Sequence, residues 1–202
     1  MLKIFNLKYK NNKLFSKNQF ETHLNIYKKS FEKINYFLFK KKINFNNFFE
    51  LIDLILDLPE SEKYVYSNIL GNYLNHHYFF KNITFNKNIL FGNIKELIIK
   101  SFNNIDNFYF NFLKMFKEIN NWGWLIINNN KLSFVSTKEN INPLFPITIG
   151  GYNSIPLLCI DLHEHCYLLD YNFNKELYIK EFLNYINWFE IENRLQNYII
   201  NN

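Results

Sequence analysis

The chain has 202 residues, of which 48% are hydrophobic, and it carries a formal net charge of +5. A chain of this length and composition can bury a substantial core, which excludes a disordered protein and favours one domain or two closely packed lobes. The lysines are scattered and Arg194 is the only arginine, whereas nucleic-acid readers favour arginine forks and clustered basic faces. We therefore expect no nucleic-acid partner, although the positive balance attracts small anions.

Signals for membranes and secretion are also missing from the sequence. No apolar run approaches the roughly 20 residues that a membrane span needs, and residues 1–15 contain no signal-peptide core. We therefore expect no membrane partner and a cytoplasmic protein, with an organellar matrix left open. The two cysteines, Cys159 and Cys166, do not indicate a disulfide framework and are predicted to be buried, reduced thiols.

The first predicted helix begins after Ser16. Gln19 follows three residues later and completes a capping-box signature. Apolar residues then recur at helical spacing from Phe20 to Leu38, and His23 lies within this apolar stripe. The sequence thus predicts a long helix whose buried face carries a histidine.

Two further helices follow in the first half of the chain. The segment FFELIDLILDLP is helical in pattern and stops at Pro59, because the proline ring excludes continuation of a helix. Another helix is predicted from Ser61 to about Phe80. It places Asn72 and His76 one turn apart on the same inward face.

The second half of the chain changes from helical to strand periodicity and back again. Two helical stretches, 93–102 and 106–119, come before WGWLII and KLSFVST, which predict two short strands joined by an asparagine turn. A third buried strand, IPLLCI, ends at Asp161. Helices return in KELYIKEFLNYINW and EIENRLQNYII.

These elements predict an α+β fold class. An N-terminal α-helical hairpin lobe, residues 1–90, is followed by an α/β lobe, residues 91–202, with a small antiparallel sheet of about three strands.

Histidine and carboxylate are concentrated in DLHEHCY, residues 161–167, although the chain has only 5 histidines. Asp161 and His165 bracket the end of the third predicted strand, while His23 and His76 sit on the apolar faces of two helices. Buried imidazole and carboxylate groups are costly unless they are paired or bound to a metal. Three neutral nitrogens and one oxygen suit a first-row transition metal such as iron, manganese or zinc. Four protein ligands would leave one position open for a small ligand.

Several segments resemble the iron/manganese superoxide dismutase family, whose signature reads DxWEHAYY. They are NYLNHHYFF, NWGWLIINNNKLSFVSTKENINPL, PLLCIDLHEHCYLLDY and YIKEFLNYINW. The similarity runs in the family's order from about Leu7 to Leu195, and its most specific element is DxxEH between a WxWL hairpin and an NW helix. The resemblance implies that the metal is held by His23, His76, Asp161 and His165.

Other residues receive roles from the same resemblance. Glu164 matches the glutamate that reaches across a dimer interface to the partner's ligand histidine, so a homodimer is implied. Trp122, the first tryptophan of the family's WxW, is retained and belongs to the candidate catalytic residues. Asn72 and Asn140 occupy the two positions at which the family places a glutamine against the metal-bound solvent. Asparagine is one methylene shorter, which leaves room for a water in that contact.

The chain also departs from the family at positions around the metal. His163 replaces a tryptophan that packs beside the metal, and such a change alters the polarity that tunes the metal and its bound solvent. Phe31 stands where the family has its active-site tyrosine, Tyr27 where it has a histidine, and Leu168 where it has an interface tyrosine. Cys166 takes the place of a small residue. The usual hydrogen-bond relay from solvent to the metal is therefore thinned.

The activity implied by the resemblance is superoxide dismutation: one superoxide is oxidised to oxygen and a second is reduced to hydrogen peroxide. It uses one manganese or iron ion per subunit, because zinc has no accessible redox couple. KLSFVST with Asn140, and YIKEFLNYINW, favour manganese, whereas an amide at Asn72 favours iron; we favour manganese.

Two alternatives stay open. One is a non-catalytic structural or assembly subunit of the same fold, which the lost relay residues favour and the retained ligand set opposes. The other is a zinc-dependent hydrolase built on HEH, against which the absence of HExxH counts.

Overall fold

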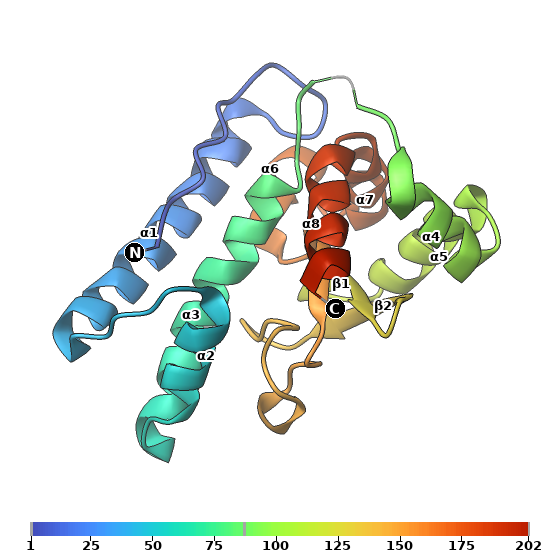
Figure 1. Ribbon diagram of the computed structural model, residues 1–202. Helices are drawn as coiled ribbons and strands as arrows, with labels where there is room; N and C mark the ends of the chain where they lie inside the picture. Colours follow the sequence, from blue (N-terminus) through green and yellow to red (C-terminus); the bar gives the residue numbers. More distant parts are fainter. Residues whose placement is uncertain (1, 87, 202) are drawn as a thin grey trace.

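The computed structural model of the chain describes residues 2–86 and 88–201. Its first half is a hairpin of two long antiparallel helices, α1 (Lys17–Lys41) and α3 (Glu60–Lys81), with the shorter α2 (Phe48–Leu56) packed beside α3 (Figure 1). The predicted helical hairpin is confirmed.

The start of α1 differs from the predicted capping box in one respect. Ser16 caps the helix as expected, since its Oγ accepts a hydrogen bond from the Gln19 backbone N–H at 3.1 Å. The buried Gln19 side chain instead donates to the carbonyl of His165 at 2.6 Å and accepts from the backbone N–H of Leu169 at 3.2 Å. Gln19 therefore ties the start of α1 to the segment around His165.

A three-stranded antiparallel sheet forms the centre of the second half. Strands β1 (Trp122–Asn128), β2 (Lys131–Thr137) and β3 (Ile155–Asp161) lie in the order β2-β1-β3. Asn129 and Asn130 join β1 to β2 with φ angles of 47° and 57°, the left-handed conformations that a two-residue hairpin turn requires and asparagine tolerates. The sheet and its asparagine turn were both predicted.

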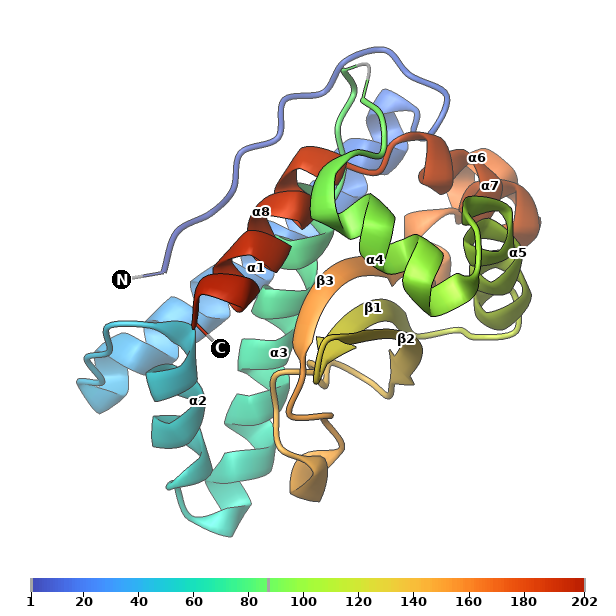
Figure 2. The ribbon, with the colours of Figure 1, turned by 45° about the vertical axis from the view of Figure 1, so that its right-hand side comes forward.

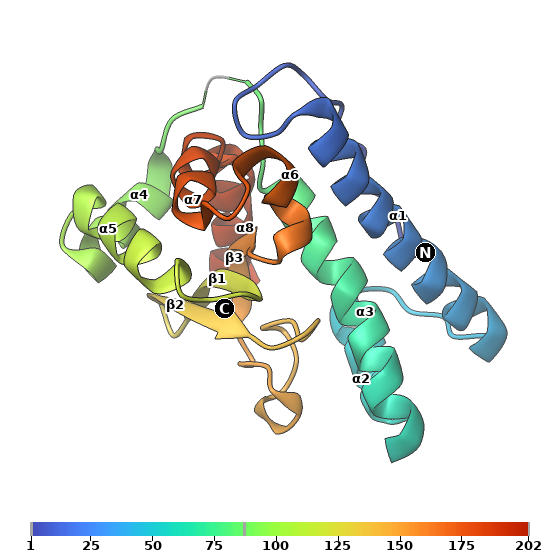
Figure 3. The same cartoon turned by 180° about the vertical axis from the view of Figure 1, so that it is seen from behind.

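Helices surround this sheet. α4 (Gly92–Phe102) and α5 (Ile105–Phe116) precede it, and α6 (Leu168–Tyr171), α7 (Lys175–Asn184) and α8 (Trp188–Asn201) follow it. α4 packs on β2 and α8, and α8 also packs on β3. Figure 3 shows α4 and α5 on the side of the sheet away from the α1–α3 hairpin.

The break between the two C-terminal helices comes earlier in the chain than the sequence pattern predicted. The segment KELYIKEFLNYINW is one helix by periodicity, but α7 ends at Asn184. The next residues pair instead with the end of α3: Ile186 bridges to Ile83, and the Asn187 backbone N–H donates to the Asn82 carbonyl at 2.7 Å. These tertiary hydrogen bonds override the helical pattern between α7 and α8.

The hairpin meets the sheet along α3, which packs against β3 while α1 packs on α3 (Figure 2). Gly71 makes this contact possible, because a Cβ atom there would lie 1.8 Å from the carbonyl oxygen of Asn140. The loop after β2 therefore approaches α3 at a position where no side chain fits.

Among the helices in the described part of the chain, none combines the length and the apolar character needed to cross a membrane.

The close approach at Gly71 gives a prediction with an unambiguous sign. Alanine is favoured over glycine inside a helix by about 1 kcal/mol, so Gly71→Ala would stabilise the protein if the site were open. We expect it to lower the free energy of unfolding by about 2 kcal/mol or more, because backbone rather than a flexible side chain blocks the Cβ. Urea unfolding measures this change. The exposed Ser61→Ala in the first turn of α3 is the control, and a stabilised Gly71→Ala protein would contradict the packing described.

Candidate metal centre

Four separate segments bring three imidazole rings and one buried carboxylate together. His23 comes from the first third of α1 and His76 from the last third of α3, both on buried faces. Asp161 is the last residue of β3, and His165 lies in the 3₁₀ turn η2 (Glu164–Cys166) directly after it. In the structure these four side chains lie close to one another.

One oxygen of the carboxylate is the centre of the cluster. Asp161 Oδ2 lies 3.2 Å from His23 Nε2, 3.2 Å from His165 Nε2 and 3.8 Å from His76 Nε2. The rings are close as well, with centroids 5.2 Å apart for His23 and His76 and 5.4 Å apart for His23 and His165. Three nitrogens therefore face a single carboxylate oxygen.

The other oxygen holds the carboxylate in place. Asp161 Oδ1 contacts His163 twice, at 3.1 Å from the backbone nitrogen and at 2.6 Å from Nδ1. The Tyr178 hydroxyl donates to the Asp161 carbonyl at 3.0 Å. Oδ2 is thereby left to face the three other imidazoles.

Burial and hydrogen bonding set the charges in this cluster. Burial alone would raise the pKa of Asp161, but hydrogen bonds from His163, His165 and His23 hold that pKa well below its usual value. Burial lowers the pKa of His23, and it lowers the pKa of His76 to about 3. The carboxylate is ionised and His76 is neutral, which are the protonation states that metal ligands need.

His76 provides the most specific indication of a bound cation. Its Nδ1 lies 2.8 Å from the carbonyl oxygen of Asn72, which can only accept, so Nδ1 carries the proton and Nε2 carries a lone pair. Within the described residues Nε2 is buried and has no hydrogen-bond partner, and the same holds for Asn72 Oδ1. A metal would satisfy the first atom and a metal-bound solvent the second. The donor set of three imidazoles and one carboxylate therefore fits manganese or iron.

The remaining candidate residues lie at different distances from this cluster. Trp122 is buried, with its ring centroid 5.1 Å from that of His76 and 5.8 Å from that of His163. The side chain of His163 is 28% exposed and connects the cluster to the surface. Glu164 is exposed and lies beside the candidate ligand His165. These three residues border the centre.

Within residues 2–86 and 88–201, Phe31 and Asn140 contact residues other than the candidate ligands. Phe31 is half-buried, and its ring lies 6.0 Å from that of Tyr73. The Asn140 amide donates to Asn68 Oδ1 at 3.0 Å, because the backbone of Asn140 is pressed onto α3 at Gly71. The Asn140 amide was expected to face the metal-bound solvent, but it contacts Asn68 on α3 instead.

Two residues near the centre were not assigned a functional position from the sequence. Gln19 was interpreted as a helix cap, although its spacing of four residues before His23 places both on the same face of α1. Cys166 was interpreted as a buried thiol. Its Sγ in fact lies 3.4 Å from His23 Nε2, and the donor atoms of His23, Asp161, His165 and Cys166 all lie within 4.8 Å of one another.

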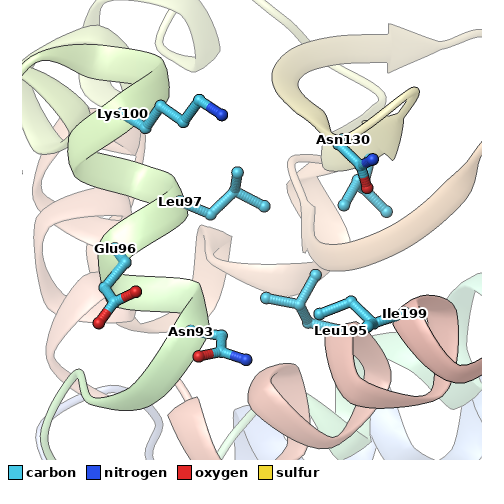
Figure 4. A pocket seen from close by; sticks show the side chains of 8 residues that line it. Asn93, Glu96, Leu97, Lys100, Asn130, Leu195 and Ile199 are labelled. Carbon is cyan, nitrogen blue, oxygen red and sulfur yellow. The ribbon is translucent and has the colours of Figure 1, made fainter.

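A pocket elsewhere in the molecule has a different character. It lies between α4, α8 and the β1–β2 turn, and Leu97, Leu195 and Ile199 face the hollow (Figure 4). Glu96 turns away from it and Lys100 lies at one end. None of the candidate ligands lines this pocket, which offers no cluster of metal donors.

Comparisons with known proteins agree with this geometry. The family model described as iron/manganese superoxide dismutases, C-terminal domain, matches residues 91–194. A manganese superoxide dismutase of Escherichia coli O157:H7 is 36% identical over 143 residues, which cover 70% of this chain and 69% of the relative. That of Buchnera aphidicola subsp. Acyrthosiphon pisum is 34% identical over 149 residues, which cover 73% of each chain.

The fold and the donor set define a protein with a single-ion metal centre. The chain belongs to the iron/manganese superoxide dismutase family, and the cofactor of this family is one manganese or iron ion per subunit.

The buried Tyr27 and the half-buried His77 form a second polar pair next to the cluster. The Tyr27 hydroxyl accepts from the Phe5 backbone N–H at 3.0 Å and is hydrogen-bonded to His77 Nδ1 at 2.7 Å. Burial raises the pKa of Tyr27 to about 12 and lowers that of His77 to about 3. Both groups are neutral in the folded protein near pH 7.

This pair predicts how the stability of the metal-free protein depends on pH. Between about pH 6.5 and pH 3 the unfolded chain protonates His77 but the folded chain does not. The free energy of unfolding therefore decreases as the pH falls, by about 1.4 kcal/mol per pH unit from His77 alone. In His77→Gln, which keeps a polar partner for Tyr27, we expect that slope to be smaller by this amount in urea unfolding at pH 6.5, 5.5 and 4.5. Glu96→Gln on α4 is the control, and equal slopes for wild type and His77→Gln would refute the prediction.

Proposed function

We propose that the protein is a superoxide dismutase that disproportionates superoxide to oxygen and hydrogen peroxide at one manganese or iron ion held by His23, His76, Asp161 and His165. One observation carries the assignment: three imidazole nitrogens face Asp161 Oδ2, and one of them, His76 Nε2, is buried with no partner among the described residues. The family to which the chain belongs supports it.

The metal, when bound, supplies the one-electron couple that the reaction needs. The protein supplies the charge and the geometry around it. One carboxylate among neutral imidazoles leaves a divalent or trivalent ion with net positive charge, which attracts the superoxide anion, and the formal charge of +5 on the chain acts in the same direction. The two hydrogen bonds from His163 orient Asp161 so that Oδ2 faces the ion.

Proton supply is where this chain differs from its family. Phe31 has no hydroxyl, and the Tyr27 hydroxyl is engaged with Phe5 and His77. The groups that could hold solvent near a bound ion are Asn72, whose buried Oδ1 is free to accept a hydrogen bond, and the partly exposed ring of His163. We propose that the protons needed for hydrogen peroxide enter along this side.

The metal preference and the lobes are part of the same proposal. We propose manganese, because the relatives named above are manganese superoxide dismutases. The lobe of residues 1–90 supplies His23 and His76, and the lobe of residues 91–202 supplies Asp161 and the remaining ligand. The retained donor set argues against a non-catalytic structural role, and a zinc hydrolase would not use these dispersed ligands.

Metal content and superoxide consumption test the proposal together. We expect the purified wild-type protein, loaded with manganese or iron, to hold about one ion per chain and to accelerate superoxide decay. Asp161→Ala should retain no metal after dialysis, since it removes the carboxylate that all three imidazoles face. If the wild-type protein binds metal but does not consume superoxide, the proposed activity is wrong and a non-catalytic role is favoured. An Asp161→Ala protein with full metal would refute the ligand assignment.

Glu164 generates a prediction about assembly. It is exposed in the single chain, and we propose that it reaches the His165 imidazole of a second copy across a two-fold interface, where a carboxylate fixes the ring. Glu164→Ala should then weaken the dimer and metal retention together, by roughly 10- to 100-fold in metal affinity. Sedimentation equilibrium and metal analysis measure both quantities. The exposed Glu60→Ala on α3 is the matched control, and an unchanged Glu164→Ala dimer with full metal would refute the prediction.

A further inference from the structure

Cys166 brings a thiol into the metal centre. It is fully buried in η2, one residue after His165, and its Sγ lies 3.4 Å from His23 Nε2. The donor atoms of His23, Asp161, His165 and Cys166 all lie within 4.8 Å of one another. The proposed function gives this thiol no task, and the family signature has a small residue at this position.

Three of the distances among these four donor atoms are close to those of a tetrahedral site. Bonds of roughly 2.0–2.3 Å to nitrogen, oxygen and sulfur ligands place neighbouring donors about 3.3–3.7 Å apart around a tetrahedral ion. The distances from Asp161 Oδ2 to His23 Nε2 and to His165 Nε2 are both 3.2 Å, and that from His23 Nε2 to Cys166 Sγ is 3.4 Å. Little movement is needed to enclose an ion.

The chemistry of this set differs from that of the set containing His76. Two imidazoles, a carboxylate and a thiolate suit zinc or cobalt in a closed tetrahedral site, whereas manganese prefers oxygen and nitrogen donors. Because the thiolate is the form that binds metals, the thiol must lose its proton when Sγ binds a cation.

We propose that His23, Asp161, His165 and Cys166 form a second binding mode of the centre, which takes a thiophilic divalent ion such as Zn²⁺ or Co²⁺. This mode rests on the proposed function for its three shared ligands and uses Cys166 in place of His76. The ion forms a bond to Sγ, the S–H bond breaks, and the proton passes to the solvent. Zinc held in this way excludes the redox-active ion.

Cobalt addition to the metal-free protein tests this mode directly. We expect Co²⁺ to give a thiolate-to-cobalt charge-transfer band in the near ultraviolet with the wild type, and no such band with Cys166→Ala. Cys159→Ala, which removes the other buried thiol, is the matched control and should keep the band. Zinc affinity of Cys166→Ala should fall by about 100-fold or more, since loss of a group outside the ligand shell already costs 10- to 100-fold.

His76→Ala distinguishes the two sets of ligands. It should keep the cobalt–thiolate band, because His76 does not belong to the thiolate mode. A wild type without the band, a Cys166→Ala protein that retains it, or a His76→Ala protein that loses it would each overturn the proposal.

X-ray absorption at the zinc edge of the wild type provides a measurement that depends on no variant. We expect one sulfur at about 2.3 Å from the zinc, and a shell of nitrogen and oxygen alone would overturn the proposal. These measurements do not involve superoxide. A protein that consumes superoxide but shows no thiolate ligation loses only this inference, and a protein with the band but no activity loses only the proposed function.

Discussion

The buried carboxylate of Asp161 determines how the helical hairpin and the sheet are placed relative to each other. A charged group with no exposure to solvent is costly unless its oxygens are satisfied. The protein satisfies Oδ1 with His163 and surrounds Oδ2 with three imidazoles from α1, α3 and η2. Each of these elements must then keep its position relative to β3. The Asp161 carboxylate thereby links the helical hairpin to the sheet.

Several contacts outside the cluster maintain that arrangement. Gln19 fastens the start of α1 to the backbone at His165 and Leu169. Gly71 lets the loop after β2 lie directly on α3. His76 and Cys166 both lie at the cluster. In the two proposed binding modes they are alternative donors, and the modes share His23, Asp161 and His165.

Features that depend on local periodicity could be predicted from the sequence, whereas features that depend on tertiary contacts could not. Helical spacing placed His23 and His76 on inward faces, and the end of an apolar run located Asp161. Two C-terminal helices were predicted, but the first was expected to continue to Trp188, because the sequence pattern does not show the hydrogen bonds to Asn82 and Thr84 that end α7 at Asn184. The second role of Gln19 and the direction of the Cys166 thiol could not be predicted either, since both depend on how η2 packs against α1.

We propose that a single ion binds among His23, His76, Asp161 and His165. Anomalous diffraction at the manganese edge from a crystal of the manganese-loaded protein can locate this ion. We expect one strong peak per chain, with the three Nε2 atoms and Asp161 Oδ2 at metal-bond distances, roughly 2.0–2.2 Å by analogy with zinc. A peak at any other place, or one of these four side chains turned away from it, would show that the ligand assignment is wrong.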